Sequence, residues 1–107
     1  MRRGTAYRVN LGEATPLELG KLRPGLIVSA TIHNERLESV VVVPLSTRPR
    51  DIWPLRVRVD VRGLKTSYAV LPGIRQVSKA RLHEPIGPVS AQLLVRVDDA
   101  LALYLSD

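Results

Sequence analysis

The sequence contains no cysteine and no phenylalanine, and only four of its 107 residues are aromatic. Without cysteine, neither a disulfide nor a thiolate metal site can form. Because aromatic rings are so few, the hydrophobic 45% of the chain consists mainly of aliphatic side chains. A core of Val, Leu and Ile suits twisted strands better than a helix bundle.

Long hydrophobic runs are also absent. The longest uninterrupted apolar run extends from Val40 to Leu45, which is far too short to span a bilayer. No basic N-terminal segment leads into an apolar stretch, as it would in a secretory signal. We therefore expect a soluble, cytoplasmic protein that does not enter a membrane, built as a single domain over residues 1–107.

Positive charge, in contrast, is plentiful. Sixteen basic residues against ten acidic ones give a net charge of +6, and thirteen of the sixteen are arginines. Five arginines lie between Arg48 and Arg62, where only Asp51 and Asp60 oppose them. Arginine suits forked recognition of phosphate or carboxylate groups, so the charge fits a nucleic-acid partner and an acidic protein partner equally well.

Alternation of apolar and polar residues predicts strands over most of the chain. The clearest is residues 55–61, which directs four aliphatic side chains to one face and Arg56, Arg58 and Asp60 to the other. Further strands are predicted at residues 7–11, 26–29, 40–45 and 68–71. The runs at 26–29 and 40–45 are apolar throughout, as in strands covered on both faces, and Pro72-Gly73 interrupts or bulges the last strand.

The C-terminal third changes its period. Ser78 is expected to cap a short turn and Ser90 a helix, with Pro85 and Pro88 separating the two pieces. The apolar stripe of that helix comprises Leu93, Leu94, Val97, Ala100, Leu101 and Tyr104. Strands followed by a helix, with short connections, predict an α+β domain with a strongly curled, mainly antiparallel sheet and a C-terminal α-helix.

The N-terminal half carries segments that resemble the PemK/MazF family of bacterial toxins. Arg2-Arg3-Gly4, with an aromatic residue at Tyr7, is similar to the opening of these toxins. Leu22-Arg23-Pro24 stands where the family has Arg-Arg-Pro before an apolar strand, and Val42-Val43-Pro44-Leu45-Ser46 resembles its Val-Val-Pro-Leu-Thr segment. Asn34 falls where the family has an Asn.

The C-terminal half continues the resemblance at family spacing. The matching segments are Trp53-Pro54-Leu55-Arg56-Val57, Ile74-Arg75, Arg81-Leu82, Pro85-Ile86-Gly87, Val89-Ser90-Ala91 and Asp98-x-Ala100-Leu101. The resemblance therefore covers essentially the whole chain. It implies a compact, barrel-like sheet with a C-terminal helix, paired as a homodimer.

The resemblance also implies a function: a metal-independent endoribonuclease toxin of a toxin–antitoxin system, inhibited by an acidic antitoxin. Such an enzyme cuts single-stranded RNA, or mRNA, because the 2′-hydroxyl attacks the adjacent phosphate and leaves a 2′,3′-cyclic phosphate. The sequence shows no Glu/Asp/His cluster with metal-ligand spacing, so we expect no metal and no cofactor.

Three residues fall on catalytic positions of the family. Arg23 offers five donors in a rigid fork, which suit it to hold the phosphate and stabilise its charge; otherwise it is a surface arginine paired with Glu18. Ser46 keeps the hydroxyl of the family's catalytic Thr, although Thr47 can substitute for it, or the hydroxyl only caps the strand. Glu18 can orient Arg23 or accept the 2′-OH proton, unless it is a solvated loop residue.

Substrate binding is expected from arginines and flat side chains, because single-stranded RNA lies in basic grooves with its bases stacked on planar groups. The candidates are Thr47, Arg48, Arg50, Trp53 and Arg75. As a tryptophan next to a proline, Trp53 also fits the description of a core anchor. His33 and His83 fall on no position that the family needs.

One departure stands out. Pro72-Gly73 replaces an acidic residue and a Gln that the family usually has before Ile-Arg, so neither side chain can read RNA here. We expect relaxed or unusual sequence preference, or feeble activity. The alternatives to an active nuclease are a non-catalytic toxin of the same fold, such as the gyrase poison CcdB, and a degenerate paralogue that retains only dimer and antitoxin binding.

Overall fold

The computed structural model describes residues 1–12 and 22–107. Seven strands, two α-helices and two 3₁₀ turns follow one another along these residues. In chain order they are β1 (Thr5–Val9), β2 (Arg23–Ile27), α1 (Thr31–Arg36), β3 (Ser39–Ser46), β4 (Arg56–Val59), β5 (Ser67–Val70), η1 (Leu71–Gly73), β6 (Arg75–Ser78), η2 (Lys79–Arg81), β7 (Leu82–Pro88) and α2 (Ala91–Tyr104).

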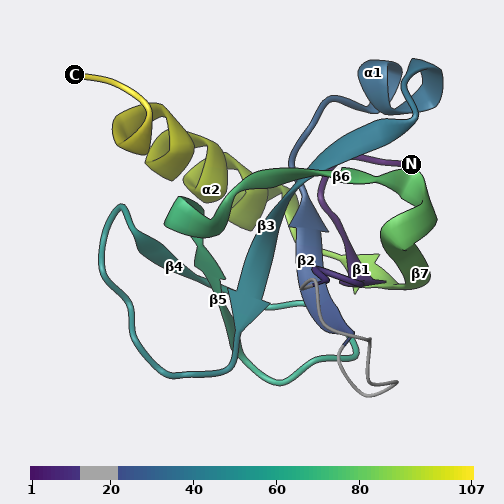
Figure 1. The fold of residues 1–107 in the computed structure, drawn as a ribbon. Coiled ribbons are helices and arrows are strands. Elements are labelled where there is room, and N and C mark those ends of the chain that lie inside the picture. Colours follow the sequence, from purple (N-terminus) through teal and green to yellow (C-terminus); the bar gives the residue numbers. More distant parts are fainter. Residues whose placement is uncertain (13–21) are drawn as a thin grey trace.

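The strands form one antiparallel sheet in the order β4-β5-β3-β2-β1-β7, and β6 pairs with the first half of β3. In the described part of the chain the sheet is curled but open (Figure 1). Its two edges meet only at an isolated bridge between Val61, beyond β4, and Val89, beyond β7. The predicted antiparallel α+β fold is confirmed, whereas closure into a small barrel is not reached.

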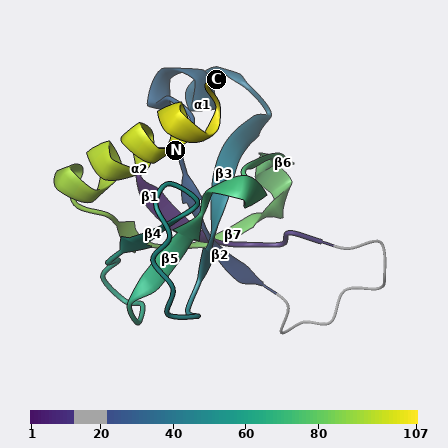
Figure 2. The same cartoon turned by 90° about the vertical axis from the view of Figure 1, so that its left-hand side faces the viewer.

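Side chains of β3 supply two cores, one on each face of the sheet. Val43 and Leu45 belong to the larger core, which α2 covers with Val97 and Ala100 (Figure 2). Val40 and Val42 belong to a smaller core on the opposite face. The prediction that residues 40–45 form a strand covered on both faces is therefore confirmed.

The C-terminal helix begins as predicted, because the Ser90 hydroxyl accepts a hydrogen bond from the Leu93 N–H at 3.2 Å. Tyr104 was expected in the buried stripe but is 38% exposed, since the helix extends beyond the core. No helix among the described residues combines the length and the apolar character that crossing a membrane requires.

Two elements differ from the prediction. Residues 82–88 form a strand despite Pro85 and Pro88, because β7 is an edge strand that pairs only with β1 and a missing N–H is tolerated there. The short helix α1 was not predicted, because it has no apolar stripe: Ile32 is 57% exposed and the side chain that it buries is the polar Asn34.

Asn34 joins three segments of the chain. Its amide nitrogen donates to the carbonyl oxygens of Met1 and Ser29, and its Oδ1 accepts from the Ser29 hydroxyl. That hydroxyl accepts in turn from the N–H of Val41 in β3. With 1% of its surface exposed, Asn34 is a buried polar group whose partners also depend on it.

We expect the substitution Asn34→Ala to lower the free energy of unfolding by about 2 kcal/mol or more, because it leaves buried partners without hydrogen bonds. Urea unfolding followed by circular dichroism measures the loss. Gln76→Ala is the matched control, since within the described part of the chain the exposed Gln76 amide donates only to the Ser39 hydroxyl. Equal stability of the two variants would contradict the structural role of Asn34.

Candidate active site

An open pocket of about 520 Å³ lies where β2 begins and β3 ends. Its lining combines two proline rings and two aliphatic side chains with four polar residues. The lining residues are Leu11, Arg23, Pro24, Pro44, Leu45, Ser46, Thr47 and Arg48. Two guanidinium groups and two hydroxyl groups therefore line the same pocket.

The antiparallel register explains why Arg23 and Ser46 meet. Gly25 lies opposite Pro44 and Ile27 opposite Val42. Continuing this register to the first residue of β2 sets Arg23 opposite Ser46, the last residue of β3. Directly opposite residues share a face of the sheet and have Cβ atoms about 5 Å apart, so one small group can contact both side chains.

Arg23 is exposed and forms no ion pair with any described residue. The predicted alternative, a pairing with Glu18, lies outside the described residues, as does the predicted role of Glu18 itself. Within the described part of the chain, the Arg23 guanidinium is available to an anion in the pocket.

Ser46 accepts a hydrogen bond from the backbone N–H of Arg48 at 3.2 Å. This is the strand-end capping that the sequence offers as the alternative to catalysis, and the two roles are compatible. A hydroxyl that accepts one hydrogen bond keeps its own proton to donate. Thr47 also lines the pocket and is exposed, so both hydroxyls are accessible.

Arg48 and Arg50 lie on the loop that follows Ser46, and both are exposed. Only Arg48 lines the pocket. Arg56 was predicted on a solvated strand face with Arg58, but it is half-buried, and its guanidinium donates to the carbonyl oxygens of Arg48 and Arg50, each at 3.2 Å. The loop is thus attached to the first residue of β4.

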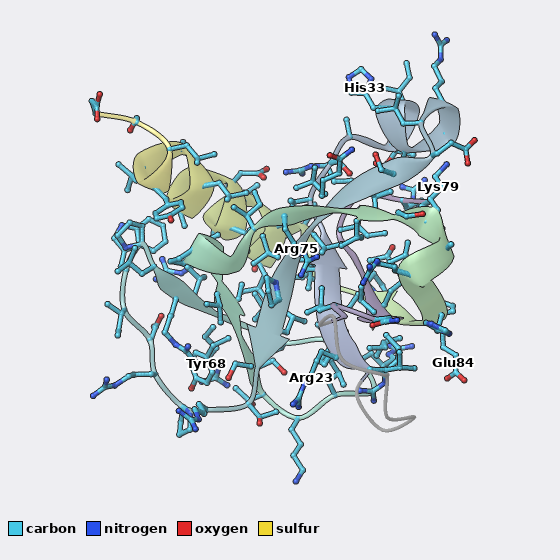
Figure 3. The ribbon with its side chains drawn as sticks, in the orientation of Figure 1. Arg23, His33, Tyr68, Arg75, Lys79 and Glu84 are labelled. Carbon is cyan, nitrogen blue, oxygen red and sulfur yellow. The ribbon has the colours of Figure 1, made fainter. Side chains whose placement is uncertain are left out.

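Arg75 and Trp53 lie outside the pocket lining. Arg75 is on the same side of the sheet as Arg23 in Figure 3 and donates to the carbonyl oxygen of Leu11, a lining residue, at 2.9 Å. Trp53 is 43% exposed, which excludes the predicted core anchor. Its ring packs under the Arg96 guanidinium of α2, 4.5 Å from the ring centroid.

Tyr68 is a neighbour of the pocket that the sequence did not indicate. It pairs with Ser46 across β5 and β3 and is half-buried, on the same side of the sheet as Arg23 (Figure 3). Its place in a strand follows from the sequence, but its position beside Ser46 depends on which strands pair.

Pro72 and Gly73 form most of the 3₁₀ turn η1, which packs against Pro44 of the pocket lining. A Cβ atom at Gly73 would come within 2.9 Å of Cγ of Pro44, a lining residue. Glycine at this position therefore allows η1 to pack closely against β3. Pro72 is exposed.

The histidines stand apart from this pocket. His33 lies on α1, far from Arg23 in Figure 3, and His83 is an exposed residue of β7. In residues 1–12 and 22–107, no three His, Asp or Glu side chains gather closely enough to hold a metal ion.

Residues 2–105 match the family described as PemK-like, MazF-like toxin of type II toxin–antitoxin system. The chain is 34% identical over 113 residues to the endoribonuclease MazF9 of Mycobacterium tuberculosis, with 98% of this chain and 96% of that protein covered. It is 26% identical over 110 residues to the endoribonuclease EndoA of Bacillus subtilis, with 99% and 95% covered.

Solved structures of toxins of this kind have a similar fold. An endoribonuclease in complex with its cognate antitoxin, from a mycobacterial species, superposes with a TM-score of 0.81 at 30% identity, covering 100% of this chain and 98% of that one. MazF from Deinococcus radiodurans shares the fold, with a TM-score of 0.79 at 20% identity and 98% and 96% covered. The chain therefore belongs to the family of PemK-like, MazF-like toxins of type II toxin–antitoxin systems.

Proposed function

We propose that this chain is a metal-independent endoribonuclease toxin that cleaves single-stranded RNA in the cytoplasm. The observation that carries the proposal is that Arg23, from the start of β2, and Ser46, from the end of β3, line the same open pocket. The relatives MazF9 and EndoA, both named endoribonucleases, support it.

In the proposed reaction the RNA supplies its own nucleophile. The 2′-oxygen forms a bond to phosphorus while the bond from phosphorus to the 5′-oxygen breaks, which leaves a 2′,3′-cyclic phosphate and a 5′-hydroxyl. The 2′-hydroxyl proton passes to a base, for which Glu18 is the candidate, and the leaving 5′-oxygen takes up a proton.

Arg23 and Ser46 take complementary roles. A guanidinium stays protonated, so Arg23 is a poor base, but its fork can hold two phosphate oxygens and stabilise the charge that develops on them. Ser46 donates its free hydroxyl proton to the same phosphate. Arg48, Arg50, Thr47 and Arg75 add contacts to the flanking backbone, and Tyr68 and Trp53 offer surfaces for stacked bases.

The proposed partners follow from charge and from exposed apolar surface. A groove that accepts RNA phosphates also accepts the carboxylates of an acidic antitoxin. Apolar side chains on the two helices and at the C-cap of α1 are more than half exposed, which supports pairing of two copies: Ile32, Leu37, Val95 and Leu103. A relative solved in complex with its cognate antitoxin supports the first of these partners.

A non-catalytic toxin of the same fold or a degenerate paralogue would carry this pocket without using it. We expect the purified protein to cleave RNA in excess EDTA and to leave 2′,3′-cyclic phosphate ends, read by phosphatase and periodate treatment. Arg23→Ala should lower the cleavage rate by about a hundredfold, the scale of losing one preorganised charge stabiliser.

The experiment needs a control for the loss of charge and a test of each hydroxyl. Arg62→Ala removes an equal charge from an exposed residue that does not line it. Ser46→Ala and Thr47→Ala, measured separately, identify the working hydroxyl. Loss of cleavage in EDTA would refute the metal-free mechanism, and an Arg23→Ala variant as fast as the wild type would refute the site.

The partners are tested in a separate experiment. We expect a dimer at micromolar concentration by light scattering. A peptide of acidic residues from the cognate antitoxin should displace bound RNA, because both occupy the same cations. A monomer would argue against the homodimer, and simultaneous binding of peptide and RNA would argue against a shared groove.

Pro72→Glu tests the departure from the family. Pro72 is exposed, so a carboxylate fits there without disturbing the packing of Gly73 on Pro44, which Gly73→Gln would force to shift. We expect the wild type to show relaxed sequence preference and RNA binding that weakens steeply with salt, because phosphate contacts supply most of the affinity. Pro72→Glu should narrow the set of cleavage sites mapped by primer extension. A long, strict recognition sequence in the wild type would contradict this reading.

A further inference from the structure

We infer that Arg56 is a positioning residue for RNA cleavage, which holds the loop after Ser46 and, through the backbone of Arg48, the Ser46 hydroxyl. The inference rests on the proposed function, because its consequence is a rate of cleavage. The contacts that carry it connect Arg56 with Arg48, Arg50 and Ile52, and Arg56 itself matches no position that the resemblance assigns to catalysis.

Arg56 binds the loop through both its backbone and its side chain. Its backbone exchanges hydrogen bonds with Ile52, from the Arg56 N–H to the Ile52 oxygen at 2.7 Å and from the Ile52 N–H to the Arg56 oxygen at 3.0 Å. Its side chain adds two more, from Nε to the Arg50 oxygen and from Nη2 to the Arg48 oxygen, each at 3.2 Å. One residue at the start of β4 thus binds three alternate residues of the loop.

The hydrogen bonds from Arg56 to Arg48, Arg50 and Ile52 form a clamp on the loop, and Arg48 connects this clamp to the pocket. Its carbonyl oxygen accepts from Arg56, while its N–H donates to Oγ of Ser46 at 3.2 Å. That N–H occupies one acceptor site of the hydroxyl and so restricts how the hydroxyl rotates. The Ser46 proton then has to point elsewhere, and the pocket that Ser46 lines is the open side.

The clamp preserves charge while it fixes geometry. Among the described residues Arg56 is bound by carbonyl oxygens and not by a carboxylate, so these contacts neutralise no charge, and Arg48 and Arg50 stay exposed. The guanidinium groups of Arg48, Arg50 and Arg56 carry like charges, with Asp51 as the one acidic residue between them in the sequence, and the hydrogen bonds from Arg56 hold the loop backbone against their repulsion. The result is a fixed cationic wall beside the hydroxyl, suited to a polyanion.

A lysine is a poor substitute for this arginine. The guanidinium donates to the two carbonyl oxygens from two different nitrogens held in one plane, whereas an ammonium has all its donors on a single nitrogen at the end of a flexible stem. Arg56→Lys therefore removes the clamp and keeps the charge. Arg58→Lys is the matched control: it makes the same change on the same face of β4, where the one ion pair of Arg58 with a described residue is that with Asp60, at 3.7 Å.

The experiment is a double-mutant cycle on single-turnover RNA cleavage, with wild type, Arg56→Lys, Ser46→Ala and the double variant. We expect Arg56→Lys to lower kcat about tenfold with a smaller change in KM, because displacement of a positioned group costs rate more than binding. Arg58→Lys should stay within about twofold of the wild type. In the Ser46→Ala background, Arg56→Lys should have almost no further effect on kcat, because its action on the chemical step passes through Ser46, whereas an effect through Arg48 and Arg50 would appear in KM.

Hydrogen exchange of the Arg48 amide, measured without RNA, gives a second readout. We expect faster exchange in Arg56→Lys than in Arg58→Lys at unchanged melting temperature. Additive effects in the cycle, or equal rates for the two lysine variants, would overturn the inference and leave the proposed function standing. A wild type that cleaves no RNA would overturn the proposed function, and the positioning role for cleavage would fall with it.

Discussion

Hydrogen bonding between β2 and β3 is the constraint on which the rest of the structure depends. The same antiparallel register that sets Gly25 opposite Pro44 carries Arg23 to Ser46, two residues further along each strand. It also determines which side chains of β3 enter each core, because a shift of one residue would exchange the two faces. Fold and candidate site therefore share one origin: a register that buries Val42 and Val43 on opposite faces also brings a cation and a hydroxyl to one pocket.

The other edge of β3 explains how a stable sheet leaves a pocket open. β3 pairs with β6 along its first half and with β5 at its end, and η1 separates these two partners. Pro72 and Gly73 stand where the resemblance leads us to expect an acidic residue and a Gln. Because Gly73 has no side chain, the backbone of η1 packs closely against Pro44 of the pocket lining. The loop that leaves Ser46 then returns to the sheet through Arg56. Paired strands thus form one side of the pocket, and the loop after Ser46, held by the hydrogen bonds from Arg56, forms another.

The comparison with relatives identifies the protein family to which this pocket belongs. Family membership rests on a match over residues 2–105 and on identity to named endoribonucleases. The local contacts of the pocket are described by the structure of this chain: Ser46 ends β3, Arg56 begins β4, and Pro72 and Gly73 lie in η1. The variants proposed above separate the effect of these residues on cleavage from their effect on the fold.

The sequence by itself determined the strand content, the antiparallel α+β class, the cap at Ser90 and the family, because alternation, capping and ordered motifs are local signals. It also indicated Arg23 and Ser46 through motif position. Tertiary structure alone decided that the sheet stays open, that residues 82–88 form an edge strand despite two prolines, and that Trp53 packs on Arg96 rather than in the core. Tertiary structure also decided the contacts of Tyr68 and Arg56. The first depend on which strands pair, and the second on how the loop after Ser46 reaches the start of β4. No local pattern encodes those choices, because they are set by the packing of residues distant in the chain.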